Sequence, residues 1–570
     1  MDEKALEKHH ELVDPPRTLF DRADELGVPI PTSCGRVGQC HECVVEVFKG
    51  ADSLGDRTDA ERFLSGEFRL ACQATLRGTK EKVDFAPLWR RPQILGSTAT
   101  SAPLDLDPAV STDGESVFRD SVQIGPFRGA LLGLAVDLGT TTVAMELVDL
   151  GVGEVVAAHT FENPQRFGGS DVMHRISYDA APAAQGELQK AAMAAINRGL
   201  RVMCEGLGCR PADVYEIVVA GNTTMRDLLF GLDVQPIGQR PYKSLTEIDM
   251  REGKASTTAL MFGARDIGIR ANREAQLIGL PVIASHVGGD TMAGLVAIGM
   301  VGSDPSGMDL SETVMFIDMG TNTEVVLRHR GVVYTASCPA GPAFEGGQVS
   351  FGMRAQEGAI ESIRLNADGE AEEFQTIGRG PPSGLCGSGL IDLLAELRRL
   401  GLMTEMGVFR NEPKLSALTV VPEWGLSLSR QDVSLLAQAK AANYAGQLIV
   451  LQTAGIGPAS VDKLYLAGAF ANYVNVENAV SIGLLVPVPE GRIRKVGNAA
   501  LGGARKALLS RRVCAVLDDF AKEVQHIELE TTADFFEVFV EGCQFKPMID
   551  QSPEVLSPHE IIDPHIEAQV

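Results

Sequence analysis

A short pattern occurs twice in this chain, 181 residues apart. Residues 135–142 and 316–323 both have the order apolar, apolar, Asp, apolar, Gly, Thr, any residue, Thr. The separation is the size of a domain and far exceeds the 20 to 50 residues of a solenoid repeat, so the pattern predicts a duplicated domain. In each copy we expect a buried strand followed by a tight turn into the next strand of a hairpin.

The two turns carry residues suited to a nucleoside triphosphate. Glycine has no Cβ, so backbone amides beside it can approach an anion closely, and threonine hydroxyls add donors. Magnesium at phosphates usually takes one or two carboxylates and keeps several waters. A single Asp-x-Gly-Thr turn can be an ordinary hairpin, but two copies favour ATP with Mg²⁺. We therefore expect Asp137 and Asp318 to hold Mg²⁺, and phosphates to contact Gly139, Thr140, Thr141, Gly320, Thr321 and Asn322.

A third glycine element, residues 464–470, predicts a buried strand that ends in small residues, where Gly468 and Ala469 would seat adenosine. The order of these elements resembles the actin, heat-shock ATPase and sugar kinase superfamily, whose two lobes close over ATP. No Walker A pattern and no convincing strand-linked G-x-G-x-x-G supports a P-loop or Rossmann fold. In the stretch 219–225, Asn222 would position the attacking water or cap the following helix.

Four cysteines near the amino terminus form a second constellation. Cys34, Cys40 and Cys43 lie within ten residues, and Cys72 follows alone. Four thiolates suit zinc or an iron-sulfur cluster. Structural zinc usually takes two compact Cys pairs, whereas C-x5-C-x2-C with one distant Cys differs by one residue from the plant-type ferredoxin spacing. The spacing favours a [2Fe-2S] cluster, with zinc as the alternative, and the other six cysteines are expected to be buried thiols.

The length of 570 residues exceeds what one hydrophobic core supports. We expect a multidomain α/β and α+β protein. Its parts are a ferredoxin-like β-grasp domain (1–91), whose opening hairpin looks reduced, a flexible linker (92–129), two actin-like lobes (130–305 and 306–545) and a polar tail (546–570). The net charge of -24 argues against nucleic acid. The chain shows neither a membrane span nor a secretory signal, so we expect it in the cytoplasm.

Together these features resemble the ATP-dependent reductive activators of corrinoid proteins, which accompany cobalamin-dependent methyltransferases. Besides the cysteine loop, the resemblance rests on residues 169–172, 221–225, 339–346, 386–392, 467–470 and 497–500. It implies that electrons from an external low-potential donor enter at the cluster. They then pass to an inactive Co(II) corrinoid on a separate protein and restore Co(I). It also implies a homodimer.

Four more residues are candidates for the site. Glu345 would act as a base or contact a metal-bound water, and Asp290 is a similar candidate. Gly387 and Ser388 would line the cleft, although Ser388 could instead cap the helix that follows. Two other functions stay open at this point: a redox-sensing phosphotransferase, and an ATP-switched partner-binding protein of the actin-like superfamily.

Overall fold

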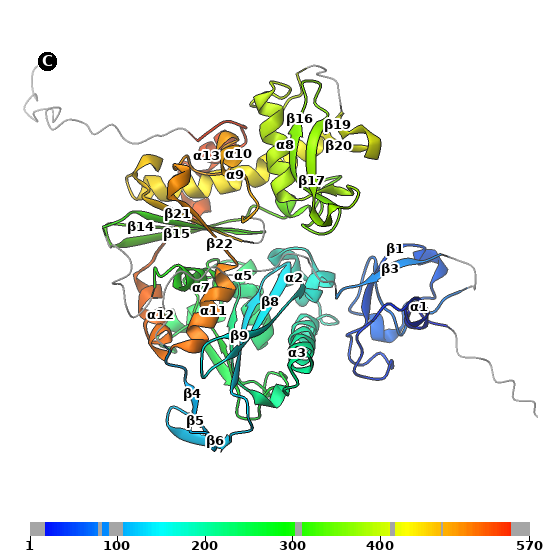
Figure 1. Ribbon diagram of the computed structural model, residues 1–570, viewed down its shortest axis with the longest axis vertical. Coiled ribbons are helices and arrows are strands. Elements are labelled where there is room, and N and C mark those ends of the chain that lie inside the picture. Colours follow the sequence, from blue (N-terminus) through cyan, green and yellow to red (C-terminus); the bar gives the residue numbers. More distant parts are fainter. Residues whose placement is uncertain are drawn as a thin grey trace, which may run out of the picture.

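The structure is a computed structural model that describes residues 17–77, 82–89, 106–301, 311–410, 416–468 and 471–548. Two lobes lie one above the other, and a smaller amino-terminal unit sits beside the lower lobe (Figure 1). The predicted class, a ferredoxin-like domain joined to a two-lobed actin-like α/β protein, is confirmed. The expected opening hairpin of the ferredoxin unit falls mostly on residues before 17, outside the described part of the chain.

The ferredoxin unit is a small antiparallel sheet with one helix. Strands lie in the order β2-β1-β3. Thr18 caps the helix by accepting from the backbone of Asp21, whose carboxylate in turn accepts from the Thr18 amide, so both ends of this capping box are satisfied. The elements are α1 (Leu19–Leu26), β1 (Val44–Lys49), β2 (Phe68–Leu70) and β3 (Asp84–Pro87).

The first lobe is a six-stranded sheet in the order β11-β12-β10-β7-β8-β9. Its central strand β7 (Leu132–Leu138) is buried, pairs antiparallel with β8 and runs parallel to β10. The remaining strands are β8 (Thr142–Asp149), β9 (Val155–Glu162), β10 (Val214–Ala220), β11 (Leu260–Gly263) and β12 (Gln276–Gly279). The helices are α2 (Val172–Asp179), α3 (Glu187–Leu207), α4 (Thr223–Phe230), α5 (Gln235–Gly238), α6 (Leu245–Arg251) and α7 (Gly289–Ala297).

The second lobe repeats this arrangement in the order β22-β21-β13-β14-β15-β23. Strand β13 pairs antiparallel with β14 and parallel with β21, as β7 does with β8 and β10. Asp318 is in register with Ala467, and Asp137 with Ala220, so the two aspartates hold equivalent places. These strands are β13 (Val314–Met319), β14 (Thr323–His329), β15 (Val332–Cys338), β21 (Lys463–Ala467), β22 (Ile493–Gly497) and β23 (Gln525–His526).

The second lobe also carries smaller sheets and several helices. The small sheets contain β16 (Ala359–Leu365), β17 (Ala371–Thr376) and β18 (Gly384–Leu385), and β19 (Ala417–Val421) with β20 (Leu426–Ser429). The helices of this lobe are α8 (Gly387–Arg399), α9 (Arg430–Thr453), α10 (Val476–Ser481) and α13 (Phe535–Gly542). Helices α11 (Ala499–Leu509) and α12 (Arg511–Glu523) belong to the same half of the sequence but pack on the first lobe.

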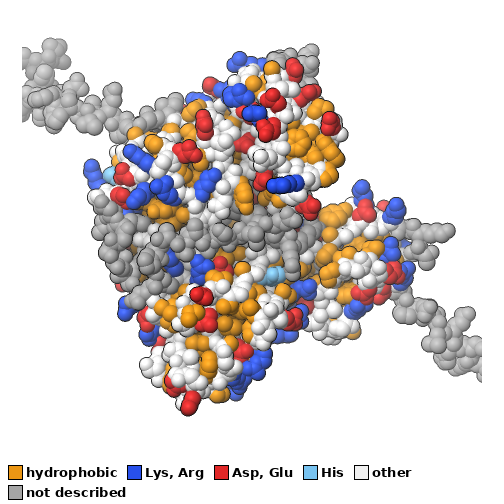
Figure 2. All heavy atoms as spheres, viewed as in Figure 1, with side chains coloured by type: hydrophobic (Ala, Val, Ile, Leu, Met, Phe, Trp, Pro, Cys, Tyr) orange, Lys and Arg blue, Asp and Glu red, His pale blue; other side chains and the backbone are white. Residues whose placement is uncertain are grey.

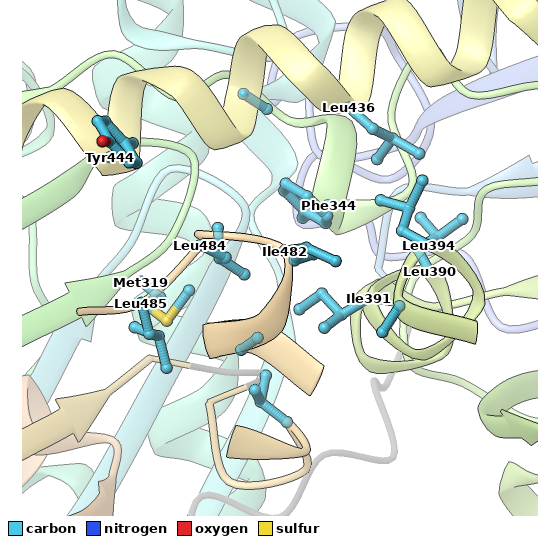
Figure 3. Packing of buried hydrophobic residues seen from close by; sticks show 14 of the residues in the cluster. Met319, Phe344, Leu390, Ile391, Leu394, Leu436, Tyr444, Ile482, Leu484 and Leu485 are labelled. Atoms are coloured by element: carbon cyan, nitrogen blue, oxygen red, sulfur yellow. The ribbon is translucent and has the colours of Figure 1, made fainter. Parts of the chain in front are cut away.

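An apolar core fixes the second lobe around its phosphate hairpin. Phe344 is buried and points toward Leu436 of α9 and Leu394 of α8 (Figure 3). Met319, the residue after Asp318, packs in the same core. Burying a large apolar side chain contributes about 1.5–3 kcal/mol, so these anchors hold the neighbouring polar residues in place.

The predicted linker is corrected in its second half. Residues 106–129 are folded and contain the three-stranded antiparallel sheet of β4 (Val110–Thr112), β5 (Ser116–Arg119) and β6 (Val122–Pro126). Val110 and Val117 are buried in the core of the first lobe, and Arg119 pairs with Glu216 at 2.7 Å. The segment has too few apolar residues to form a core of its own, and it folds by packing Val110 and Val117 into the core of the first lobe. Residues 90–105 lie outside the described part.

The predicted boundary between the two lobes at residue 306 also needs correction, because one helix that follows it packs on the first lobe. Helix α11, assigned by sequence to the second lobe, packs on α7 and on β7 of the first lobe. Leu501 and Leu508 of α11 share a core with Met292 of α7 and Ala135 of β7. The segment of α11 and α12 therefore returns to the first lobe, and the chain after it, with β23 and α13, packs on the second lobe again. The predicted tail is described only as far as residue 548.

On the face shown in Figure 2, Lys and Arg side chains are interspersed with Asp and Glu. The net charge of -24 is thus not gathered into one acidic patch on this face. Among the described residues, no helix combines the length and apolarity that crossing a bilayer requires.

Candidate functional site

Both hairpin turns line one cavity of about 220 Å³ between the lobes. The structure thereby brings together predicted residues that are up to 331 positions apart in the chain. Those that line it are Asp137, Gly139, Thr140, Thr141, Asn222, Asp318, Gly320, Thr321, Asn322, Glu345, Gly387 and Gly468. Ala469, the other predicted adenosine contact, lies outside the described residues.

Two of the glycines are required by close backbone approaches. A Cβ at Gly139 would lie 2.6 Å from the carbonyl oxygen of Thr142. Gly468 has φ of 107°, and a Cβ there would lie 2.1 Å from the carbonyl oxygen of Met319. Both positions therefore exclude other residues, and both leave the backbone exposed to the cavity.

Four carboxyl groups share the cavity, Glu324 buried and the other three half-buried, and each has a raised pKa. Burial raises the pKa of Asp318 to about 8, and repulsion from Asp290 and Asp137 adds to it. Burial raises the pKa of Asp137 to about 7, against a 2.7 Å hydrogen bond from the Asn498 amide. Burial also raises the pKa of Asp290 to about 6 and that of Glu324 well above its usual range. A bound cation would relieve this crowding, so the donor set fits Mg²⁺.

Glu345 joins the two hairpins. Its carboxylate accepts a 2.7 Å hydrogen bond from the Thr141 hydroxyl and a 2.8 Å bond from the Thr321 hydroxyl. The two hydroxyl oxygens are 3.4 Å apart. Glu345 therefore occupies, in this state, the donors that the sequence assigns to phosphates. Its place follows from its neighbour Phe344, which is anchored in the core described above.

Asn222 caps the following helix, which is one of its two predicted uses, and it also contacts the first hairpin. Its carbonyl oxygen accepts from the Met225 amide and caps α4, while its amide donates to the Thr140 hydroxyl at 2.9 Å. The prediction for Ser388 is corrected. Its side chain does not cap α8, because Cys386 is the N-cap residue, and Ser388 is not among the residues that line the cavity. Its buried hydroxyl donates to the carbonyl oxygen of Glu361 at 2.7 Å.

The four amino-terminal cysteines lie together around the 34–43 loop. The Sγ atoms of Cys43 and Cys72 are 3.4 Å apart, and Thr32 Oγ1 is 3.9 Å from the Sγ atoms of both Cys34 and Cys40. The cysteines thus form two pairs. Burial opposes ionisation of Cys34, but backbone N–H groups of this loop outweigh it and lower its pKa to about 6.

This arrangement fits a two-iron cluster better than a single zinc ion. Within the described ranges, no three His, Cys, Asp or Glu side chains converge as one metal ion requires. A [2Fe-2S] cluster needs two Cys pairs rather than one point of convergence, and thiolates stabilised by backbone amides suit it. Among the described parts of the chain all ten cysteines are free thiols. Of the six outside this loop, Cys204, Cys338 and Cys386 are buried as predicted, whereas Cys209, Cys514 and Cys543 are half-buried.

The ferredoxin unit packs directly on the first lobe. His41, between two of the cysteines, has its Nδ1 2.5 Å from Glu187 Oε2 on α3. The Tyr178 hydroxyl donates to the Phe63 carbonyl oxygen at 2.6 Å, and an ion pair joins Arg166 to Glu46 of β1. The cysteine loop is therefore held beside the nucleotide lobe.

Several residues of the cavity escaped the sequence prediction. Glu324 has no counterpart in the first hairpin, where Val143 stands, so comparing the two copies could not reveal it. A charged residue within the apolar run of β14 was the available signal. Asn498 belongs to one of the stretches that carried the resemblance, but no role was assigned to it. Its contact with Asp137 spans 361 positions.

Comparison with known families covers nearly the whole chain. Residues 4–77 match a 2Fe-2S iron-sulfur cluster binding domain, residues 132–303 match the RACo middle region, and residues 312–555 match the C-terminal domain of RACo, the ASKHA domain. The first match spans all four cysteines, and the other two span the two hairpins.

Individual proteins agree with these matches. The corrinoid activation enzyme RamQ of Eubacterium limosum is 26% identical over 92% of this chain and 96% of its own length. A reductase of the Co(II) methylated amine-specific corrinoid protein, from Methanosarcina barkeri, is 24% identical over 71% of this chain and 75% of its own. The solved structure of a reductive activator for a corrinoid, iron-sulfur protein has a TM-score of 0.67 and 28% identity, and the match covers 93% of this chain and 96% of that one. With all of its domains matched in the same order, the chain belongs to the family of reductive activators of corrinoid proteins.

Proposed function

We propose that this chain uses ATP to deliver an electron to the Co(II) form of a corrinoid held on a separate protein, restoring Co(I) for methyl transfer. The observation that carries this proposal is the packing of the four-cysteine unit against the lobe that bears the first phosphate hairpin. The names of the similar proteins, a corrinoid activation enzyme and a corrinoid protein reductase, support the same reaction.

The roles of the cavity residues follow from their chemistry. Asp137 and Asp318 would hold Mg²⁺, and the Thr141 and Thr321 hydroxyls would donate to the phosphates of ATP. Asn222 holds the Thr140 hydroxyl and would orient the attacking water. Backbone groups around Gly468 would contact adenosine.

Cys34, Cys40, Cys43 and Cys72 would hold the [2Fe-2S] cluster, which supplies one-electron transfer when it is bound. The protein orients the loop through its contacts with the first lobe. An external low-potential electron donor and a homodimer are further parts of this proposal, and the family resemblance is their support.

The energy of nucleotide binding explains why ATP is useful. A ligand that shifts a two-state equilibrium from 1:99 to 99:1 supplies about 5.5 kcal/mol. For one electron, where a tenfold change corresponds to about 59 mV, this equals about 240 mV. Closure of two lobes over ATP can therefore drive an electron transfer that is unfavourable by itself.

The experiment measures Co(I) formation by absorbance under anaerobic conditions, with a corrinoid-binding protein of a methyltransferase system and dithionite as reductant. We expect Co(I) to accumulate with ATP and not without it. Asp318→Asn should abolish the ATP effect, whereas Asp368→Asn, an exposed aspartate in the turn between β16 and β17, should preserve it. Equal Co(I) yields with and without ATP would refute the proposal.

A further inference from the structure

A second cavity, of about 440 Å³, lies at the junction of the ferredoxin unit and both lobes. Thr140 and Thr141 line this junction cavity and also line the nucleotide cavity, as does Arg354. The first phosphate hairpin is therefore a wall common to both spaces. From the ferredoxin side, residues 65–68 and Glu46 complete the junction cavity.

Three arginines line the junction cavity. Arg166 pairs with Glu46, and its Nη1 is 3.5 Å from Glu162. Arg354, from the second lobe, pairs with the other oxygen of Glu162 at 2.5 Å. Two of the three guanidinium groups thus share one carboxylate of the first lobe, with Glu46 of the ferredoxin unit as the other partner.

The third arginine, Arg175 of α2, is only 1% exposed, yet its hydrogen bonds all go to neutral acceptors. Nη2 donates to the Thr140 carbonyl oxygen at 2.6 Å, Nε to the Gly169 carbonyl oxygen at 3.1 Å, and Nη1 to Met225 Sδ at 2.8 Å. Among the described residues no carboxylate forms an ion pair with it. Burying a charge is costly unless it is paired, so the geometry favours an anion nearby. Burial also lowers the pKa of Arg175 to about 9.

We propose that the junction cavity is a binding site for inorganic phosphate, which enters it across the first hairpin after ATP hydrolysis. The inference rests on the proposed function, which supplies the phosphate. In hydrolysis a bond forms between the water oxygen and the γ-phosphorus. The bond from that phosphorus to the β–γ bridging oxygen breaks, and ADP, inorganic phosphate and a proton result. Arginine is well suited to hold such a tetrahedral oxyanion through two parallel N–H groups.

The site links hydrolysis to the position of the ferredoxin unit. Phosphate at Arg166 competes with Glu46, the ferredoxin carboxylate that the same guanidinium already binds. The product of one lobe's chemistry thereby acts on the contact that holds the cysteine unit in place.

The test is equilibrium dialysis of ³²P-labelled inorganic phosphate against the full chain with its cluster, saturated with ADP and Mg²⁺. We expect saturable binding of one phosphate per chain. Arg166→Gln should weaken it about tenfold or more, the size of one lost hydrogen bond to a charged group. Glu67→Gln, which removes an exposed carboxylate from the cavity wall, should strengthen it about two- to fivefold. The matched controls Arg62→Gln and Asp59→Asn lie on the exposed ferredoxin surface and should leave it unchanged.

Several results would overturn the site. One is the absence of saturable binding up to about 10 mM phosphate. Another is a phosphate affinity that neither Arg166→Gln nor Glu67→Gln changes. Loss of binding in Thr321→Ala with none in Arg166→Gln would place the phosphate in the nucleotide cavity instead. ATP hydrolysis by the same samples separates the two proposals. A chain that hydrolyses no ATP refutes the proposed function, whereas an active chain without Arg166-dependent binding refutes only the phosphate site.

Discussion

Removing the Glu345 carboxylate should strengthen ATP binding. This single side chain connects the two lobes, because it accepts from Thr141 of one hairpin and Thr321 of the other. If the terminal phosphates of ATP take these two hydroxyls, as proposed, they must first displace the carboxylate. Glu345 then acts as a competitor of the nucleotide, and Glu345→Ala removes the competition.

The size of the effect follows from two hydrogen bonds. A net hydrogen bond to a charged group contributes about 1.5–3 kcal/mol, and the half-buried position of Glu345 argues for the lower end. Two such bonds give about 3 kcal/mol, and 1.4 kcal/mol corresponds to a factor of ten. We therefore expect ATP to bind Glu345→Ala about 100-fold more tightly. Glu345→Gln keeps one acceptor and should fall between the variant and the wild type.

Isothermal titration with a non-hydrolysable ATP analogue and Mg²⁺ measures this directly. Glu423→Ala, an exposed glutamate of the same lobe, is the matched control and should bind like the wild type. Unchanged affinity in Glu345→Ala would mean that the phosphates do not use the two hydroxyls. Weaker binding would mean that Glu345 contacts the Mg²⁺ site, which is the other role predicted from the sequence.

Three further predictions follow from other parts of the molecule. Cys72→Ser should abolish the visible absorption of the anaerobically purified protein, whereas Cys209→Ser should not; equal spectra would contradict the assignment of the cluster. Mg²⁺ affinity should rise more than tenfold from pH 6 to pH 8, because Asp137 and Asp318 must lose protons held with pKa values of about 7 and 8, and a flat titration would count against both as ligands. Burial lowers the pKa of Lys440 to about 7, so the unfolded chain binds one more proton between pH 7 and the ordinary lysine pKa near 10.5; stability should rise with pH across this window, by at most about 1.4 kcal/mol per unit. Urea unfolding of Lys440→Met should show a flatter pH dependence there, and an unaltered slope would exclude this lysine as its source.

The parts of the site that could be predicted are those encoded by short stretches. Gly139 and Asp137 belong to one turn, and the backbone leaves so little space at Gly139 that the residue type itself signals the close approach. The pattern could be recognised in both copies because each copy forms its own hairpin. The same holds for Cys34, Cys40 and Cys43, whose spacing along one loop sets their arrangement.

The parts that escaped depend on contacts between distant segments. Residues 106–129 have a composition that cannot form a core, and they fold because Val110 and Val117 enter a core that the first lobe already supplies. The prediction for Ser388 placed it just before a helix, but the helix begins earlier, at Gly387. The Ser388 hydroxyl instead donates to the carbonyl oxygen of Glu361 in β16. Local propensity cannot anticipate either outcome.

Two charged residues beside the first hairpin show most clearly why the rest of the site could not be predicted from the sequence. In the sequence Arg175 looks like any helical arginine, yet folding buries it and its guanidinium donates to the carbonyl oxygen of Thr140. Glu345 likewise gains its meaning only because Phe344 anchors it where two hairpins from different lobes meet. Arg175 is buried with neutral acceptors, and Glu345 is half-buried between two hydroxyls, so a nucleotide or its phosphate would change the environment of both. Both residues contact the first hairpin, which is the wall that the nucleotide cavity shares with the junction cavity, so a phosphate in either cavity would alter the surroundings of that hairpin.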